Sequence, residues 1–424
     1  MSEIIQKKIL VLGAGYGGAY TFKYLHKRFH KNKRVSLKLV NRNNYFISTP
    51  LLHEVATGSI SPEHIVEPLR KILACTHEEF VMASVGSVSL ASKTVTTTAG
   101  ELEYDYLVMA LGAETNYRGV PGAQEHTLTL KSLEDAISLK NHFIEVFERA
   151  SRMEPGPEQD KTLCFVLVGA GATGVELAAE MRDLFWRTFV KYYKPELLAR
   201  ARIIIIHAGD DLLPNFERDL RVKSKYILRK KGIDLRFGIQ VVEVRDKAIL
   251  LNTGELLESE TIIWTAGVKP SSIGFDVDLP KDRQGRIIVN QYFQIADFPE
   301  VFVLGDQAAF KNPDGGDYLP MLAQVAHKES EGVARNVIRQ IEGKPLLRYT
   351  YKHMGDLISL GDWMAAGEIF GVRLFGHLTW FLWRGIYLAK LLSPSKKAKV
   401  LLDWIVNLFS PRDISELYKC EPKD

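Results

Sequence analysis

The sequence predicts an α/β protein with two Rossmann-like dinucleotide-binding domains. The prediction depends on two glycine-rich loops, Gly13-Ala14-Gly15-Tyr16-Gly17-Gly18 and Gly169-Ala170-Gly171-Ala172-Thr173-Gly174. Each loop follows an apolar run, 9–12 or 165–168, and precedes a segment with helical periodicity. In such a unit the first glycine permits a tight turn, the second lets backbone approach a pyrophosphate and the third lets helix and strand pack closely. One such loop is weak evidence, but two in full context indicate two dinucleotide sites.

The elements of the first half follow in order from this pattern. We expect a strand at 8–12, a helix at 17–30 and a second strand at 35–40. Ser61 as a cap and Pro62 at the first position predict a helix at 61–74. Further predicted elements are strands within 85–98 and 104–110, a helix at 132–150 and a linker at 153–161.

The second half repeats the pattern, which places one unit inside the other. We expect a strand at 163–168, helices at 173–190 and 217–231, and strands at 202–207, within 233–251 and at 261–264. The chain then returns with a strand at 301–304 and a helix at 322–341. The predicted domains are therefore 1–130 with 270–345, an inserted domain at 131–269, and a C-terminal region at 346–424.

Composition is that of a soluble protein, with 46% hydrophobic and 25% charged residues and a net charge of +4. Cys75, Cys164 and Cys420 form no paired motif, which excludes a disulfide framework and fits a reducing compartment. The short N-terminal segment before the first strand predicts no signal peptide, and no uncharged apolar stretch is long enough for a transmembrane span. We expect no metal site and no nucleic-acid partner.

The C-terminal region is unusually basic and aromatic. Residues 370–412 carry a net charge of +6, which leaves −2 for the rest of the chain. A helix is predicted at 372–392, with Arg373, His377 and Arg384 on one stripe, and a second at 396–410. In the second helix the polar stripe is Lys396, Lys399, Asp403, Asn407 and Ser410, and Leu401, Trp404, Ile405, Leu408 and Phe409 face the other way.

Together with Trp380 and Trp383, these two amphipathic helices predict an interfacial anchor on an anionic membrane surface. The alternative is a helical hairpin that packs on the body of the protein or forms a homodimer interface.

These motifs resemble the two-dinucleotide-binding-domain flavoproteins of the pyridine nucleotide-disulfide oxidoreductase superfamily, and specifically the type II NADH:quinone oxidoreductases. The resemblance covers nearly the whole chain. Besides the two loops it is carried by the segments 49–58, 111–113, 131–136, 264–267, 303–306 and 323–324. It implies FAD at the first loop and NADH, with NADPH possible, at the second.

The resemblance also implies which residues form the sites. FAD would be bound by Gly13, Gly15, Gly18, Asn41, Thr49, Leu52, Ala110, Gly112, Asp306, Ala323 and Gln324. The nicotinamide dinucleotide would be bound by Gly169, Gly171, Gly174, Glu176, His207 and Gly267. Glu176, Gln324 and Lys328 would orient rings or relay protons during catalysis. Without the flanking motifs, Glu176 reads as a solvated first-turn acid, Gln324 as an ordinary interior amide and Asp306 as a helix cap.

Three positions depart from the family pattern. Asn41 stands where an acid usually accepts hydrogen bonds from the ribose, and His207 stands where NADH-using relatives carry Glu. His207 removes the charge that would reject the 2′-phosphate of NADPH, and its protonated form would attract that phosphate. Lys328 replaces a second Gln; it either stabilises a quinol anion, marks a changed acceptor or points to solvent.

The chain lacks the redox cysteine pairs of disulfide reductases and sulfide-oxidising relatives, so electrons would leave the flavin for a diffusible acceptor. The sequence therefore predicts a peripheral, non-proton-pumping NAD(P)H:quinone oxidoreductase at the cytoplasmic face of the cell membrane, using menaquinone or ubiquinone. Two alternatives stay open: an FAD-dependent oxidoreductase with a soluble acceptor, and a redox-sensing flavoprotein with little quinone activity.

Overall fold

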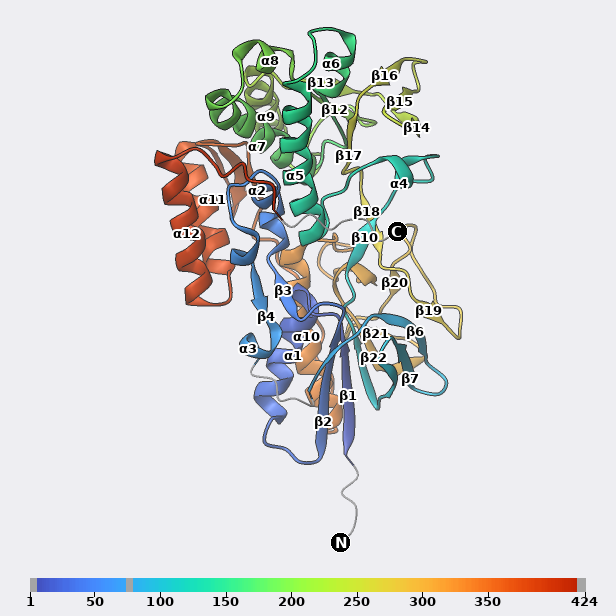
Figure 1. The fold of residues 1–424 in the computed structure, drawn as a ribbon. Helices are drawn as coiled ribbons and strands as arrows, with labels where there is room; N and C mark the ends of the chain where they lie inside the picture. The colour runs from blue at the N-terminus through green and yellow to red at the C-terminus, as the bar shows by residue number, and fades with distance from the viewer. Residues whose placement is uncertain (1–5, 74–78, 418–424) are drawn as a thin grey trace. The chain divides into compact units, whose positions relative to one another are not determined.

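The computed structural model describes residues 6–73 and 79–417, which form two compact units (Figure 1). The first unit comprises 1–47, 66–114 and 268–352, and the second comprises 48–65, 115–267 and 353–424. Segments of the two units alternate along the chain, and the second unit includes 48–65, 115–130 and the C-terminal region, which the predicted domains had placed outside the inserted one.

The first unit is built on a six-stranded sheet in the order β21-β22-β9-β1-β2-β5. These strands are Gln294–Ile295, Phe298–Val303, Tyr106–Met109, Lys7–Leu12, Val35–Asn41 and Phe80–Met82. The strands β22, β9, β1, β2 and β5 run parallel. Helices α1 (Tyr16–Phe29) and α10 (Ala323–Ile341) lie side by side (Figure 1). The apolar run of β1 is fully buried, as expected for a parallel strand covered on both faces.

A smaller sheet in the same unit has the order β19-β6-β7-β8, formed by Gly274–Phe275, Val85–Ser89, Thr94–Thr97 and Gly100–Glu103. Strand β22 brings residues 301–303 beside β9, which in turn pairs with β1. The ends of these parallel strands therefore lie at the same edge of the sheet as the first glycine loop.

The second unit has a parallel four-stranded sheet in the order β13-β12-β11-β17. Its strands are Asp234–Phe237, Arg202–His207, Cys164–Val168 and Thr261–Trp264. Helices α5 (Leu133–Ala150), α7 (Ala172–Asp183) and α9 (Arg218–Lys230) accompany it, and a three-stranded sheet of β14 (Val241–Arg245), β15 (Ala248–Leu251) and β16 (Leu256–Glu258) lies nearby. Cys164 is buried in β11, where it belongs to the core.

Three predicted elements need correction. The predicted helix 61–74 is wrong: a single 3-10 turn, Pro62–His64, is followed by β4 (Val66–Pro68), which pairs with β3 (Tyr45–Ile47), and by a short helix, Leu69–Ile72. Pro68 cannot occupy a helix interior, since it lacks an N–H and its ring clashes with the preceding turn. The predicted linker 153–161 contains a helix, Pro157–Thr162, and the predicted helix 173–190 leaves α-helical geometry at Leu184.

The C-terminal region also begins differently from the prediction. Residues of the expected helix 372–392 first form β26 (Val372–Gly376), which pairs with β25 (Ala365–Ile369). Helix α11 then covers His377–Lys390, and α12 covers Pro394–Phe409 beside it (Figure 1). Within the ranges described above, no helix combines the length and hydropathy required to cross a bilayer.

Candidate functional site

The first glycine loop joins β1 to α1 and has the geometry of a phosphate cradle. Gly13 has φ +89°, and a Cβ there would lie 2.3 Å from the Ala110 carbonyl oxygen. A Cβ on Gly18 would lie 1.8 Å from the Gly13 carbonyl oxygen, which is sterically impossible. Gly15, in contrast, has no heavy atom within 4 Å of a Cβ position. The first and third glycines are therefore required by the fold, whereas the second leaves open space at the N-terminus of a helix, where an anion binds.

Three other predicted FAD residues, Asn41, Ala110 and Gly112, belong to the same unit as this loop. Asn41, at the end of β2, accepts a hydrogen bond from the Ala14 N–H at 2.9 Å through Oδ1 and donates to the Asn43 carbonyl at 2.7 Å. Asn41 thus holds the glycine loop by a hydrogen bond to its backbone. An amide can do this without the negative charge that an acid would place beside a phosphate-binding loop. Ala110 follows β9 and donates to the Leu12 carbonyl, and Gly112 has φ +71° with open space around its Cβ position.

A buried acid accompanies Asp306 in the first unit. Asp306 lies in the 3-10 turn Gly305–Gln307 that follows β22. Glu329 of α10 accepts a hydrogen bond from the Gly305 N–H at 2.6 Å and is 1% exposed. Burial raises the pKa of Glu329 to about 8, and the Asp306 charge acts in the same direction. The sequence prediction missed Glu329, although its place on the apolar face of the predicted helix 322–341 was a signal.

The other residues predicted on α10 lie near its start. Ala323 and Gln324 are half-buried in the first turn. Lys328 is exposed, while its neighbour His327 stacks on Tyr20 with ring centroids 4.1 Å apart. Thr49 and Leu52 belong to the second unit, in the 3-10 turn Thr49–Leu51 and at the start of α2 (Leu52–Ala56).

The second glycine loop repeats this cradle between β11 and α7. Gly169 has φ +116°, and its Cβ would lie 2.7 Å from the Thr265 carbonyl carbon. A Cβ on Gly174 would lie 2.1 Å from the Gly169 carbonyl oxygen, and Gly171 again faces open space. The same division of roles among three glycines thus occurs in both units, and both loops fit a pyrophosphate.

His207 lies at the end of β12 and half-buried beside the second loop, where its Nδ1 accepts from the Ala170 N–H at 3.4 Å. Burial lowers the pKa of His207, and the positive charge of Arg118 lowers it further. Arg118 donates through Nε to the Ala266 carbonyl at 2.8 Å and lies against Gly267, which has φ +138°. Sequence reasoning did not single out Arg118, and no local motif marks it.

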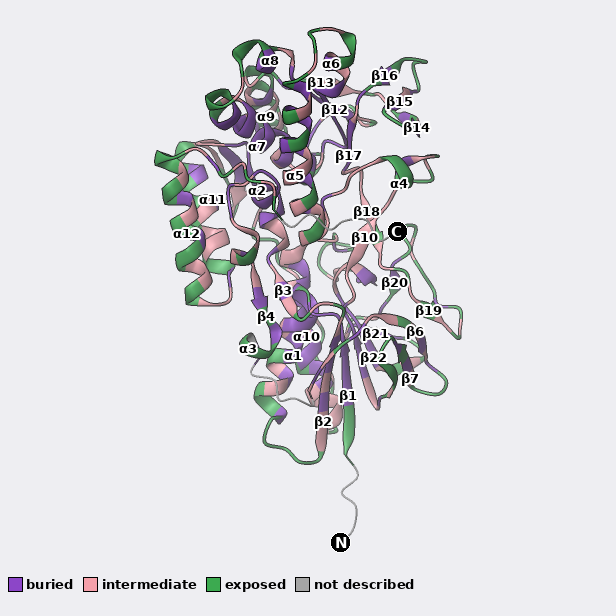
Figure 2. Cartoon of the chain, in the orientation of Figure 1, coloured by how far each residue is buried: buried purple, intermediate pink, exposed green. Residues whose placement is uncertain are grey.

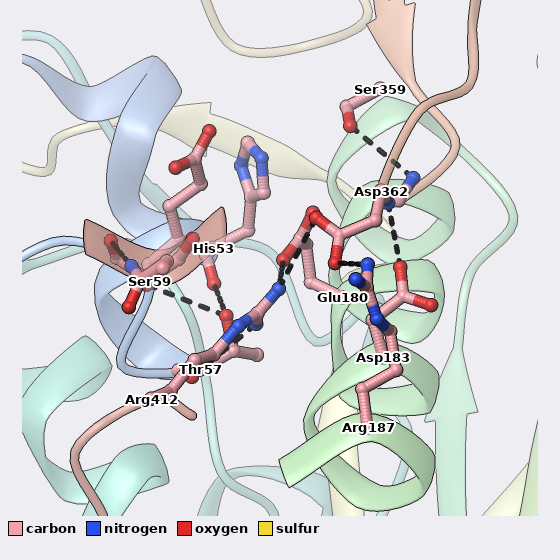
Figure 3. A network of polar contacts seen from close by, with 12 residues as sticks. His53, Thr57, Ser59, Glu180, Asp183, Arg187, Ser359, Asp362 and Arg412 are labelled. Carbon is pink, nitrogen blue, oxygen red and sulfur yellow. Dashed lines mark hydrogen bonds and ion pairs between the residues drawn. The ribbon is translucent and has the colours of Figure 1, made fainter. Parts of the chain in front are cut away.

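A network of buried charges connects α2, α7 and the C-terminal segment of the second unit (Figure 3). The Arg412 guanidinium lies 2.7 Å from Glu180 and 3.7 Å from Asp362, and it also donates to the Thr57 carbonyl at 3.4 Å. Asp183 pairs with Lys231 at 2.6 Å. Burial acts to lower the pKa of Arg412, but the neighbouring carboxylates outweigh it, so the pKa lies above its ordinary value.

The acids Glu180, Asp183 and Asp362 have carboxylate oxygens within 4.8 Å of one another. Arg412, Lys231 and Arg187, which contacts Asp362, supply three positive charges to these three acids. The cluster is therefore neutralised by the protein's own cations. The sequence prediction did not include any of these residues, because their partners come from segments as distant as α7 and residue 412.

A family model described as pyridine nucleotide-disulphide oxidoreductase matches residues 7–330, which contain both glycine loops. The chain belongs to this family. Within the family, the type II NADH:quinone oxidoreductase of Staphylococcus saprophyticus is 30% identical over 380 residues, 89% of this chain and 93% of that protein. The type II NADH:quinone oxidoreductase Ndh of Mycobacterium tuberculosis is 30% identical over 421 residues, 96% of this chain and 89% of that protein.

Solved structures agree with this pyridine nucleotide-disulphide oxidoreductase fold. NDH2 of Plasmodium falciparum in complex with NADH has a TM-score of 0.88 at 20% identity, with 97% of this chain and 100% of that chain covered. The sulfide:quinone oxidoreductase of Aquifex aeolicus has a TM-score of 0.72 at 17% identity, with 95% of each chain covered. The predicted membership of the type II NADH:quinone oxidoreductases is thus confirmed.

The aromatic residues of the C-terminal helices lie differently from the prediction. Trp380, Trp383 and Trp404 are 2%, 1% and 3% exposed, so they do not face outward as expected. Arg384 lies between Trp380 and Trp404, at 3.9 and 4.6 Å from their rings, and is not part of an exposed stripe. Arg373, in β26, pairs with Glu217 and Asp219. Arg384 therefore packs between tryptophan rings inside the second unit, and Arg373 forms ion pairs with α9 and the residue before it.

The polar stripe of α12 is likewise used inside the second unit. Asp403 accepts from His64 at 2.6 Å, and Asn407 donates to the Ser59 carbonyl at 2.7 Å. Helices α11 and α12 both carry exposed residues (Figure 2), and many of these are large and apolar. They include Leu378, Phe381, Leu382, Leu401, Leu402, Ile405, Val406, Leu408 and Phe409.

Proposed function

We propose that this protein is a type II NADH:quinone oxidoreductase that binds FAD at the first glycine loop and NADH at the second. The observation that carries the proposal is the repeated cradle, in which two glycines are sterically fixed and the middle one faces open space. Relatives that are 30% identical over most of the chain have this activity in their names. Bound FAD would accept hydride from NADH and pass two electrons to the quinone.

The chain's own residues bind and orient these groups. The N–H groups at the starts of α1 and α7 would each hold a pyrophosphate. Asp306, Ala323 and Gln324 would contact FAD, and Glu176, in the first turn of α7, would lie at the nicotinamide end of the second site. Lys328 is exposed in the structure, and we propose that it contacts the electron acceptor.

We infer that the outward face of α11 and α12 rests on a lipid surface. Leu378 is 81% and Phe409 is 84% exposed, and continuous apolar surface of this kind is rare on monomeric proteins. Lys390 and Lys399 are exposed on the same two helices and would meet anionic headgroups. This placement would bring a membrane-dissolved quinone to the protein without a spanning helix.

Vesicle flotation tests the anchor. We expect Phe381→Ser with Phe409→Ser to weaken binding to anionic phosphatidylglycerol vesicles at least tenfold, since each buried side chain contributes about 1.5–3 kcal/mol. Leu256→Ser, which changes a 48% exposed residue on β16, is the matched control and should leave binding unchanged. If the double variant floats like wild type, the face does not bind lipid. If wild type sediments as a dimer and the double variant as a monomer, the face is a protein interface instead.

Steady-state oxidation of NADH and NADPH with menaquinone liposomes tests the activity. Fast turnover by the FAD-loaded protein supports the proposal. The ratio of the rates with NADPH and NADH shows whether His207 permits the 2′-phosphate. Flavin reduction without quinone reduction would instead favour a soluble acceptor or a redox-sensing role.

A further inference from the structure

A short turn in the second unit holds Arg118 in a backbone conformation that arginine rarely adopts. Arg118 has φ +53°, and the next residue, Gly119, has φ +72°. The Val120 N–H donates to the Tyr117 carbonyl at 3.0 Å and closes the turn. Gly, Asn and Asp are the residues that favour this left-handed region. Backbone strain of this kind persists only where the surrounding structure holds it, and it is concentrated at ligand sites.

Hydrogen bonds fix this turn to the C-terminal end of β17. The Asn116 N–H donates to the Gly267 carbonyl at 3.1 Å, and the Trp264 indole donates to the Asn116 carbonyl at 2.9 Å. The Asn116 side chain accepts from the Arg118 N–H at 2.8 Å. The Arg118 Nε–H in turn donates to the Ala266 carbonyl at 2.8 Å. Both the turn and the direction of the guanidinium are therefore set before any ligand binds.

The outer end of this guanidinium is available to a ligand. Arg118 is exposed, and within the described part of the chain its Nη groups make no hydrogen bond or ion pair. A guanidinium is a planar fork of N–H donors that stays charged at any working pH, and its geometry matches phosphate. Because the Nε–H is used by Ala266, the two Nη groups remain for an anion.

The guanidinium lies beside the second glycine loop. A Cβ on Gly169 of this loop would lie 2.8 Å from the Ala266 nitrogen, and a Cβ on Gly267 would lie 2.9 Å from the Arg118 Nη2. The charge of Arg118 also lowers the pKa of His207, although β11 lies between β12 and β17 in the sheet. The guanidinium is therefore directed over the carboxyl edge of the sheet, where open parallel sheets bind dinucleotides.

The loop needs a positive charge that it does not contain. Residues 169–174 carry no charged side chain, so the loop offers a pyrophosphate only backbone N–H groups and the dipole of α7. His207 stands on the β12 side, where the adenosine ribose is bound, and Arg118 stands on the β17 side. A dinucleotide that crosses the loop at Gly171 therefore has its pyrophosphate between these two residues.

We propose that Arg118 binds the pyrophosphate of the nicotinamide dinucleotide through its Nη groups, opposite the N–H groups at the start of α7. This inference rests on the proposed NADH site at the second glycine loop. Arg118 would act in binding and not in hydride transfer, because it holds a part of the dinucleotide that does not react.

Calorimetric titration of the FAD-loaded protein with ADP-ribose tests the contact, because ADP-ribose carries the pyrophosphate and cannot reduce flavin. We expect Arg118→Asn to raise the Kd about tenfold or more, since a charge-assisted hydrogen bond is lost, and to make the Kd less sensitive to salt. Arg152→Asn, which changes another exposed arginine of this unit, is the matched control and should leave the Kd unchanged.

Thermal melts separate binding from a structural role. Asn adopts the left-handed conformation more readily than Arg, so Arg118→Asn should unfold at the wild-type temperature or above. In NADH:ferricyanide turnover, the KM for NADH should rise with the Kd while kcat stays within about twofold of wild type. A lower unfolding temperature with an unchanged Kd would show that Arg118 only holds the turn, and would overturn the inference.

2′-Phospho-ADP-ribose distinguishes the two phosphate groups that an arginine could bind here. Similar losses of affinity for both ligands support the pyrophosphate contact, whereas a loss confined to the 2′-phosphorylated ligand would overturn it. If Arg118→Asn binds ADP-ribose as tightly as wild type does, the inference fails and the proposed function stands. If wild type binds neither ligand, the proposed NADH site fails together with the inference.

Discussion

Removal of the Arg412 side chain should destabilise the protein strongly. Arg412 is 6% exposed and supplies the positive charge for Glu180, while Asp183 has Lys231 and Asp362 has Arg187. In Arg412→Met, Glu180 therefore becomes a buried carboxylate that has lost its ion-pair partner and keeps only the weaker influence of Arg384. Removing one partner of a buried ion pair costs about 3–5 kcal/mol. We expect a loss of that size in urea unfolding of the FAD-loaded protein at pH 7.5.

The pH dependence identifies the cause. Burial raises the folded-state pKa of Glu180 even with Arg412 present, and loss of Arg412 raises it further. The stability that protonated Glu180 contributes is therefore present below about pH 4.5 and lost as pH rises. The deficit of Arg412→Met should thus grow from pH 5 to pH 8. Adding Glu180→Gln should restore part of the stability. A deficit below about 1 kcal/mol, or one that stays constant with pH and in the double variant, would refute the assignment of Arg412 as the counter-charge.

Three further predictions concern single sites. Gly174→Ala should raise the KM for NADH at least tenfold without loss of bound FAD, because its Cβ would meet the Gly169 carbonyl oxygen at 2.1 Å; FAD loss measured by absorbance would contradict this. Wild-type Glu329, with its pKa raised to about 8, stabilises the fold while it is protonated and loses that contribution as pH rises from about 5 to 8. In Glu329→Gln, thermal melts should no longer show this decrease in stability. The NADPH/NADH ratio of kcat/KM should rise only below about pH 6.5, because burial lowers the pKa of His207; a rise between pH 7 and pH 8, or one that persists in His207→Glu, would exclude this histidine.

The glycine loops were predictable because their requirements are local. Gly18 is confined by the Gly13 carbonyl within the same strand–loop–helix unit, and Gly13 takes a φ of +89° for the turn itself, so sequence spacing carries this geometry. Glu329 and Arg412 were not predictable in this way. Their partners lie 24 and 232 residues away, and only the place of Glu329 on the apolar face of its helix distinguished it from a surface charge.

The C-terminal helices show why an amphipathic pattern does not reveal which face is inward. The pattern of α12 places Asp403 and Asn407 on one side, and the usual assignment sends polar side chains to water. In this chain His64 and the Ser59 carbonyl supply partners for both residues, so the polar side is satisfied inside the second unit. Tryptophan enrichment was misleading for the same reason, since Trp404 finds its hydrogen-bond partner in Glu54.

The contacts that hold the C-terminal segment to α2 and α7 are separate from its apolar outward face. Because Trp404 donates to Glu54 and Arg412 pairs with Glu180, the C-terminal segment is held by residues adjacent to His53 on α2 and one turn from Glu176 on α7. The apolar face of α11 and α12 takes no part in these bonds. Substitutions on that face should therefore change binding to the proposed lipid surface and leave the buried charge network intact, whereas Arg412→Met should disturb that network even in detergent, where no membrane is present.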